Sequence, residues 1–297
     1  MNQIFYKDIR TSNLGFGTSL LTRNNSVKDA MSNLETAFDF GITHFDCAKL
    51  YGFGHAEMIL GKFAKGKRHD ITITTKTGLR GKKLPLWALP LINRVRSVVK
   101  SKQSSITNNS FIGAPVSGVF SPSLILGDLH SSLNKIGTDF VDFYLLHEAN
   151  ITQANQEDII ASLQQCKDAG KIKMFGIASN SQTIRNEYQY LNKAYQVLQH
   201  NDQVFEQNIA LMPIVNQQFV RIVYNIFSKF KQIESKLAFD KELIDPIKLI
   251  LSYYKKENEN GITLFSATNN ENIRDTVLKW NSLSKIDLLK PSLYNWQ

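Results

Sequence analysis

Short segments rich in β-branched and aromatic residues alternate with amphipathic segments along most of the chain, and this alternation restricts the possible folds more than any other feature. Strands are predicted for residues 14–18, 42–45, 71–76, 140–147, 172–177, 219–227 and 261–265. Strands separated by helices pair in parallel, and a number near eight closes the sheet into a barrel. We therefore predict the α/β class and a (β/α)8 TIM barrel, with residues 1–297 forming a single domain.

Helical segments follow most of these strands. They are predicted for residues 26–40, 55–63, 121–136, 156–169, 181–198, 245–255 and 269–280. Ser26 is suited to cap the first of them, and Ser121 followed by Pro122 is a strong helix start. One strand of the second half is missing from this assignment, because residues 204–218 show no clear pattern and contain Pro213.

The alternation is interrupted between Thr77 and Phe120, and we predict that these residues form a long insertion after the third strand. The segment contains seven Lys and Arg residues and neither Asp nor Glu. Loops of this length inside a compact domain are usually functional or disordered. Residues 87–99 fit a basic amphipathic helix, which is typical of a lid or of a surface for a membrane or a partner. A solvated insertion without such a role fits the same residues equally well.

Composition and charge exclude several classes of protein. The chain has 297 residues, 42% of them hydrophobic, and a net charge of +9. No apolar run is long enough to span a membrane, and the N-terminus lacks the apolar region of a signal peptide. The two cysteines form no CxxC motif, so we predict no disulfide, no metal site and a reducing cytoplasmic location. The positive charge is compatible with an anionic cofactor, and we predict no nucleic-acid partner because no binding motif accompanies it.

Four residues with proton-transfer chemistry lie at or just after predicted strand ends. Asp46, Lys76 and His147 end three strands, and Tyr51 lies in the loop after the first of them. Because a barrel gathers the carboxyl ends of its strands at one mouth, we expect the four side chains to meet. A nearby ammonium would lower the pKa of the phenol, the carboxylate would hold the lysine, and the imidazole would hydrogen-bond a carbonyl oxygen. Such a set suits the reduction of a carbonyl compound.

Each of these residues also has a structural interpretation when it is considered alone. Asp46 fits a local cap or ion pair, Tyr51 a half-buried loop aromatic, and Lys76 a surface lysine with a buried stem. A single histidine such as His147 is more often a buried, hydrogen-bonded residue than a functional group. Their common placement at strand ends favours the functional interpretation.

Five motifs, in the same order and with matching spacing, resemble the aldo-keto reductase superfamily. They are LGFGT at 14–18, FDCAKLYG at 45–52, TTKTG at 74–78, SLNKIGTDFVDFYLLHE at 132–148 and GIASN at 176–180. The resemblance implies that Tyr51 is the general acid and base, that Asp46 and Lys76 tune it, and that His147 orients the substrate. It implies an NAD(P)H-dependent oxidoreductase that reduces a small-molecule carbonyl substrate, an aldehyde or a ketone, to an alcohol.

The same resemblance implies a site for NADPH or NADH, with NADPH slightly favoured. Gly17 and Thr18 would contact the cofactor at the end of the first strand, and Ser179 and Asn180 would contact the nicotinamide carboxamide. The adenosine end would lie after the last strand, at Ser266, Thr268, Asn272 and Asp275. Two of these, Ser266 and Asn272, occupy positions where the family often has a lysine and an arginine for the 2′-phosphate.

Fewer residues match the later strands of the family. Residues 223–225 resemble strand six, where the family has a glutamine three residues before a tyrosine. Tyr224 is therefore assigned to the cofactor site with Arg221 in the glutamine position, and Gln207 is the alternative. Strand seven of the family supplies an aromatic residue that stacks on the nicotinamide, and no segment between 228 and 240 resembles it.

The sequence is also compatible with a function other than carbonyl reduction. In this alternative, the protein is a cofactor-binding regulatory or partner-binding protein on the same barrel. The basic insertion and the cofactor positions that depart from the family, on strands six and seven and at the adenosine end, favour this alternative. The sequence leaves the substrate and the oligomeric state open.

Overall fold

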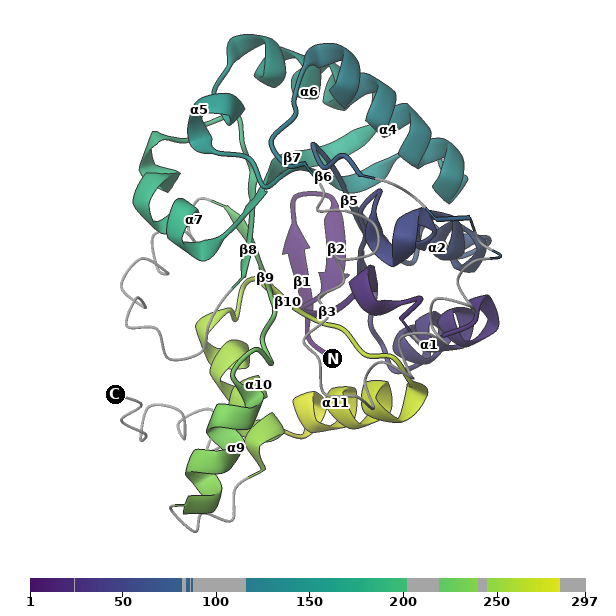
Figure 1. Cartoon of the computed structure of the whole chain (residues 1–297), viewed down its shortest axis with the longest axis vertical. Helices are drawn as coiled ribbons and strands as arrows, with labels where there is room; N and C mark the ends of the chain where they lie inside the picture. Colours follow the sequence, from purple (N-terminus) through teal and green to yellow (C-terminus); the bar gives the residue numbers. More distant parts are fainter. Residues whose placement is uncertain are drawn as a thin grey trace.

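Eight parallel strands form a closed barrel with helices around it (Figure 1), as the sequence predicts. The structure is a computed structural model and describes residues 1–23, 25–81, 84–85, 87, 116–201, 219–239 and 245–283. The barrel strands, in spatial order, are β3 (Leu14–Gly17), β4 (His44–Asp46), β5 (Thr72–Thr77), β6 (Val141–His147), β7 (Ile172–Ser179), β8 (Val197–Asn201), β9 (Val220–Tyr224) and β10 (Ile262–Phe265). β10 pairs with both β9 and β3, and this pairing closes the barrel.

The larger helices are α1 (Val27–Asp39), α2 (Ala56–Ala64), α4 (Pro122–Ile136), α6 (Glu157–Asp168), α7 (Ser181–Glu187), α9 (Phe230–Phe239), α10 (Pro246–Glu257) and α11 (Asn270–Ser282). Two of the helices, α1 and α4, begin at the serine caps that the sequence indicates. Ser26 caps α1 in a capping box with Asp29, and Ser121 accepts a hydrogen bond from the Leu124 amide at the start of α4. Gly137 ends α4 in the left-handed conformation (φ 71°) that suits glycine.

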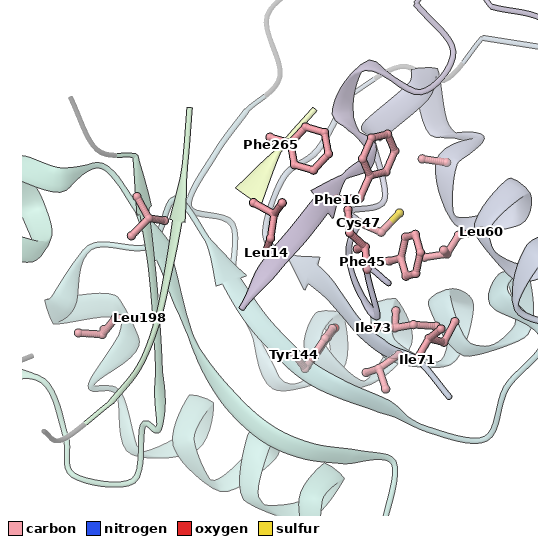
Figure 2. Packing of buried hydrophobic residues seen from close by; sticks show 14 of the residues in the cluster. Leu14, Phe16, Phe45, Cys47, Leu60, Ile71, Ile73, Tyr144, Leu198 and Phe265 are labelled. Carbon is pink, nitrogen blue, oxygen red and sulfur yellow. The ribbon is translucent and has the colours of Figure 1, made fainter. Parts of the chain in front are cut away.

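Two apolar layers hold the barrel in place. The larger layer lies between the strands and the helices, where Phe16 meets Phe265 and Phe45 lies beside Leu60 (Figure 2). The smaller layer fills the barrel interior with alternate residues of the strands, such as Phe143 and Ile222. The hairpin of β1 (Gln3–Tyr6) and β2 (Ile9–Ser12) crosses the centre of the barrel in Figure 1 and adds Ile9 to the interior layer. The four proton-transfer residues predicted from the sequence lie at the carboxyl-terminal mouth of the barrel, where the strands end.

The predicted helix at 181–198 is wrong in its second half. α7 ends at Glu187, a short 3-10 turn covers Tyr188–Tyr190, and β8 begins at Val197 as the sixth barrel strand. Hydrogen bonding to β7 and β9 on both sides fixes β8 as a strand, which a local pattern cannot reveal. Consequently β9, assigned above to strand six, is the seventh strand of the barrel.

The insertion leaves the barrel after β5 and returns at α4. Its two ends are joined by paired backbone hydrogen bonds between Arg80 and Val116, both 2.8 Å long. Asp128 of α4 accepts hydrogen bonds from Thr77 and Arg80, each 2.6 Å long, and pairs with Lys49. Apart from residue 87, the helix predicted at 87–99 lies outside the described residues, as do residues 204–218 and the tail from residue 284.

None of the helices in the described part of the chain has both the length and the apolarity that a membrane crossing requires.

The contact between α2 and α4 yields a stability test at two glycines. A Cβ on Gly61 would lie 2.4 Å from the Ile136 carbonyl oxygen, whereas a Cβ on Gly127 would meet nothing within 4 Å. We expect Gly61→Ala to lower the free energy of unfolding by about 1–3 kcal/mol through overpacking. Gly127→Ala should raise it by about 0.5–1 kcal/mol, because alanine is the better helix former. Urea unfolding of both variants measures the difference, and equal effects would contradict this packing.

Candidate active site

A buried ion pair lies at the centre of the barrel mouth. The Lys76 ammonium at the end of β5 donates hydrogen bonds to both carboxylate oxygens of Asp46, over 2.7 and 2.8 Å, and to the Cys47 carbonyl oxygen over 3.0 Å. Asp46 and Lys76 are only 3% and 2% exposed. Thr18 donates to the Asp46 carbonyl oxygen and so holds the end of β4 from behind. The ion pair therefore has the additional hydrogen bonds that a buried charge requires.

Tyr51 is brought to this pair by an unusual turn after β4. The 3-10 segment Tyr51–Gly54 contains Gly52 and Phe53 in the left-handed region, at φ 57° and 59°. Glycine adopts this conformation freely, and the phenylalanine is held in it by the surrounding loop. The Lys76 ammonium lies 3.4 Å from the Tyr51 hydroxyl and 4.8 Å from the centre of its ring. The phenol and the ammonium are thus direct neighbours.

His147, at the end of β6, completes the predicted group of four. Its ring meets the Tyr51 ring edge to face, with ring centres 5.9 Å apart and an interplanar angle of 81°. Burial, and then the charge of Lys76, lower the pKa of His147 well below its ordinary value. The imidazole is therefore neutral near pH 7 and retains one N–H to donate.

The structure corrects the expected pKa of Tyr51. We expected the ammonium to lower it, but burial raises the pKa of Tyr51 well above its ordinary value, and the carboxylate of Asp46 adds to this effect. Tyr224 lies on the same cavity, and burial raises its pKa to about 12. Both phenols are therefore protonated near pH 7, which suits a proton donor better than a base.

Gln199, on β8, is a part of this site that the sequence analysis missed. Its side-chain amide donates to Asp46 Oδ2 over 2.8 Å, and the residue is 2% exposed. Its amide oxygen is buried and has no hydrogen-bond partner among the described residues. The family has a glutamine on strand six, and Gln199 is the glutamine that the sixth barrel strand carries. The first residues of that strand, 197 and 198, are predicted from the sequence as the end of a helix, so the strand is not recognised there. Gln207 lies outside the described residues.

The placement of Arg221 in the cofactor site is wrong. Alternate residues of β9, Val220 and Ile222, face the barrel interior, so Arg221 faces the helices. Its guanidinium donates to His200 Nε2 over 3.1 Å and to the Glu257 carbonyl oxygen over 3.0 Å. It contributes to packing between the barrel and α10 rather than to the mouth.

Two adjoining cavities run from Asp46 and Tyr51 toward α11. The first, of about 490 Å³, is lined by Gly17, Ser19, Leu20, Arg23, Asp46, Tyr51, Tyr224, Asn225, Ile226, Phe227, Leu264, Phe265 and Ser266. The second, of about 300 Å³, is lined by Leu20, Phe227, Phe230, Ile247, Phe265, Ser266, Ala267, Thr268, Asn272, Asp275 and Thr276. They share Leu20, Phe227, Phe265 and Ser266, so together they form one elongated groove.

Most of the predicted cofactor residues lie along this groove. Gly17 and Tyr224 line the first cavity, Ser266 lines both, and Thr268, Asn272 and Asp275 line the second. Tyr224 reaches the groove from the seventh strand, not from the sixth. Arg23 and Phe227 also line the groove but are not among the predicted site residues. Arg23 lies outside every predicted strand and motif, and Phe227 ends a predicted strand without belonging to a motif.

Besides Arg221, three of the predicted cofactor residues lie outside the groove. Thr18 is fully buried behind Asp46. Ser179 is buried at the end of β7, and Asn180 caps α7 by accepting a hydrogen bond from the Thr183 amide over 2.8 Å. None of the three lines either cavity.

The protein is thus a (β/α)8 barrel with a buried ion pair, a phenol and an imidazole at its mouth and a groove beside them. The model of the aldo/keto reductase family matches residues 13–201. The chain belongs to this family.

Individual relatives are distant. The chain is 29% identical over 185 residues to the uncharacterized oxidoreductase YqkF of Bacillus subtilis, which is 61% of this chain and 49% of that protein. It is 25% identical over 244 residues to the NADH-specific methylglyoxal reductase of Escherichia coli, 76% of this chain and 65% of that protein. The chain thus spans about half or less of the length of the first curated relatives that it matches.

Solved structures share the fold. The holo form of an aldo-keto reductase from Bacillus halodurans superposes with a TM-score of 0.74 at 18% identity, covering 98% of this chain and 95% of that one. An aldo-keto reductase of Klebsiella pneumoniae in complex with NADPH gives a TM-score of 0.67 at 15% identity, covering 99% and 95%. Both comparisons support the barrel and its complete circuit of eight strands.

The buried ion pair predicts unequal effects of two lysine substitutions. Lys76→Met leaves the Asp46 carboxylate buried without its cation, and we expect a loss of about 3–5 kcal/mol in the free energy of unfolding. Lys49→Met is the matched control, because its partner Asp128 retains Arg80 and Thr77. Its loss should be about 1 kcal/mol or less. Chemical unfolding followed by circular dichroism compares them, and equal losses would contradict the arrangement.

Proposed function

We propose that the protein is a nicotinamide-dependent carbonyl reductase in which Tyr51 donates the proton. One observation carries this proposal: the protonated Tyr51 phenol lies 3.4 Å from a buried ammonium, at the end of an elongated groove. A general acid needs a proton to give and a group that stabilises the charge left behind. Tyr51 has the first, and Lys76 supplies the second.

The residues of the groove fit a nicotinamide dinucleotide. Gln199 does not line the groove itself, but it hydrogen-bonds Asp46, which does, and its unpaired buried oxygen suits an N–H donor of the kind that a primary carboxamide provides. The Tyr224 ring lies on the same cavity as Asp46 and Tyr51, where an aromatic ring of a ligand can stack on it. The groove then continues past Ser266 into the second cavity, which has room for the other end of a long ligand. We propose NADPH or NADH as the cofactor.

The chain's own residues would carry the proton half of the reaction. The cofactor, when bound, supplies the hydride that reaches the carbonyl carbon. Tyr51 gives its hydroxyl proton to the carbonyl oxygen, so that an alcohol forms and a phenolate remains. The Lys76 ammonium stabilises that phenolate, and Asp46 keeps the ammonium in place. Although the resting phenol is a weak acid, the alkoxide that develops during hydride transfer is a stronger base than phenolate, so the transfer is favourable.

His147 would hold the substrate for this transfer. A neutral imidazole donates one hydrogen bond to the carbonyl oxygen without competing for the proton. Its edge-to-face contact with Tyr51 sets the donor beside the phenol. Small aldehydes and ketones are the proposed substrates, and methylglyoxal, named for the E. coli relative, belongs in the first panel to be tested.

Replacing Tyr51 by phenylalanine tests the proton donor. We expect Tyr51→Phe to reduce kcat on any accepted carbonyl by about 10²–10⁴-fold, because the general acid is lost. Cofactor affinity should change little, since the ring remains. The matched control is Tyr190→Phe, whose side chain is 67% exposed and lines neither cavity. Unchanged turnover in Tyr51→Phe would show that Tyr51 is not the proton donor.

Measurements of cofactor binding and of carbonyl turnover distinguish the proposed reductase from the alternative function. A protein that binds the cofactor but turns over no member of a broad carbonyl panel would be a cofactor-binding regulatory or partner-binding protein on this barrel. The Arg80–Val116 pairing marks where the basic insertion can be shortened to test for such a partner.

The pKa shifts predict a broad pH plateau for reduction. The lowered pKa of His147 keeps the imidazole neutral as pH falls toward 6, and the raised pKa of Tyr51 keeps the phenol protonated as pH rises above 8. We expect the rate of reduction to stay constant within about twofold between about pH 5.5 and 8.5. Initial rates at saturating cofactor measure this profile. A steep decline centred near pH 6.5 would show instead that His147 titrates at its ordinary pKa.

A further inference from the structure

Opposite charges occupy the two halves of the groove. Among the described residues that line the first cavity, Arg23 is the one cation, and the Asp46 carboxylate is already neutralised by Lys76. Among those that line the second cavity, Asp275 is the one charged residue. An extended anionic ligand therefore meets a guanidinium in the first half and a carboxylate in the second.

Asp275 is placed to act on a ligand. It belongs to α11, and its side chain is 46% exposed. One carboxylate oxygen accepts from Lys279 over 2.8 Å, and Lys279 also pairs with Asp245 over 2.8 Å. Two carboxylates thus share one ammonium, and the group keeps a net negative charge. Asn272 lines the cavity one turn before Asp275 and adds a neutral polar group.

We propose that this charge pattern selects NADH over NADPH, an inference that rests on the proposed function. With the nicotinamide beside Tyr51 and the adenosine in the second cavity, the diphosphate lies between them, and Arg23 binds it. A guanidinium matches phosphate oxygens in charge and geometry. Asp275 accepts a hydrogen bond from a hydroxyl of the adenosine ribose, as carboxylates do in NAD-dependent sites. The same carboxylate repels a 2′-phosphate. This reverses the slight preference for NADPH that the sequence suggests.

Isothermal titration of the full chain with NADH and with NADPH tests the selection directly. We expect NADH to bind at least about tenfold more tightly, because a dianionic phosphate close to a carboxylate costs about 1.4 kcal/mol or more. Asp275→Asn should tighten NADPH and weaken NADH, so that the ratio of the two dissociation constants falls severalfold. Asn272→Arg should improve NADPH further by adding a cation to the cavity wall.

Two control variants separate a direct effect of Asp275 from an indirect one. Asp275→Asn also frees Lys279 from one partner. Asp245→Asn frees the same lysine, keeps the cap of α10, and removes a carboxylate that does not line the cavity. Arg274→Gln changes the charge of the neighbouring position, which is exposed and outside the groove. Both should leave the ratio of dissociation constants unchanged, and melting curves of all variants confirm that they fold.

Arg23→Ala tests the diphosphate contact. Both cofactors carry the diphosphate, so both should bind about tenfold more weakly with their ratio unchanged. Affinities unaffected by Arg23→Ala would overturn the role of Arg23. NADPH binding as tightly as NADH, or a ratio that follows Asp245→Asn as well, would overturn the selection by Asp275 while carbonyl reduction still stands. Binding of neither cofactor would overturn this inference and the proposed function together.

Discussion

The ion pair between Lys76 and Asp46 is the interaction on which the rest of the mouth depends. Burying two charges costs several kcal/mol for each ion unless their remaining hydrogen bonds are satisfied. Here the Cys47 carbonyl and the Gln199 amide satisfy them, so the pair links β4, β5 and β8. Tyr51 then packs against the pair instead of against solvent. Because the charges are enclosed, the protein maintains this geometry before any ligand arrives, which is the preorganisation that electrostatic catalysis requires.

The same enclosure sets the protonation of the two groups that would meet a carbonyl. Burial penalises a charged form, so it raises the pKa of Tyr51 and lowers that of His147. Both side chains are neutral hydrogen-bond donors over the neutral range, and the full charge of the site stays on Lys76 and Asp46. An open mouth would weaken both shifts and would leave His147 able to compete for the proton.

The first half of the barrel could be predicted from the sequence because its strands are local signals. Runs such as Ile71–Lys76 are rich in β-branched residues and end on the residues that the mouth presents. β8 gives no such signal, since its last residues are Gln199, His200 and Asn201 and only its neighbours fix it as a strand. That error moved Tyr224 to the wrong strand and put Arg221 in the place of Gln199. The side-chain period of two then turns Arg221 outward to His200, whose pKa is lowered by burial to about 3.

Correcting the strand order also changes the balance between the two functions. A second half of the chain without a glutamine on strand six and an aromatic residue on strand seven would favour a regulatory protein. Gln199 lies on the sixth strand and Tyr224 on the seventh, and both lie at the mouth. The remaining difference is at the proposed adenosine end, where Ser266 and Asn272 occupy positions that often hold a lysine and an arginine in the family, and Asp275 adds a carboxylate. A changed charge pattern in an intact groove favours a changed cofactor form over a lost activity.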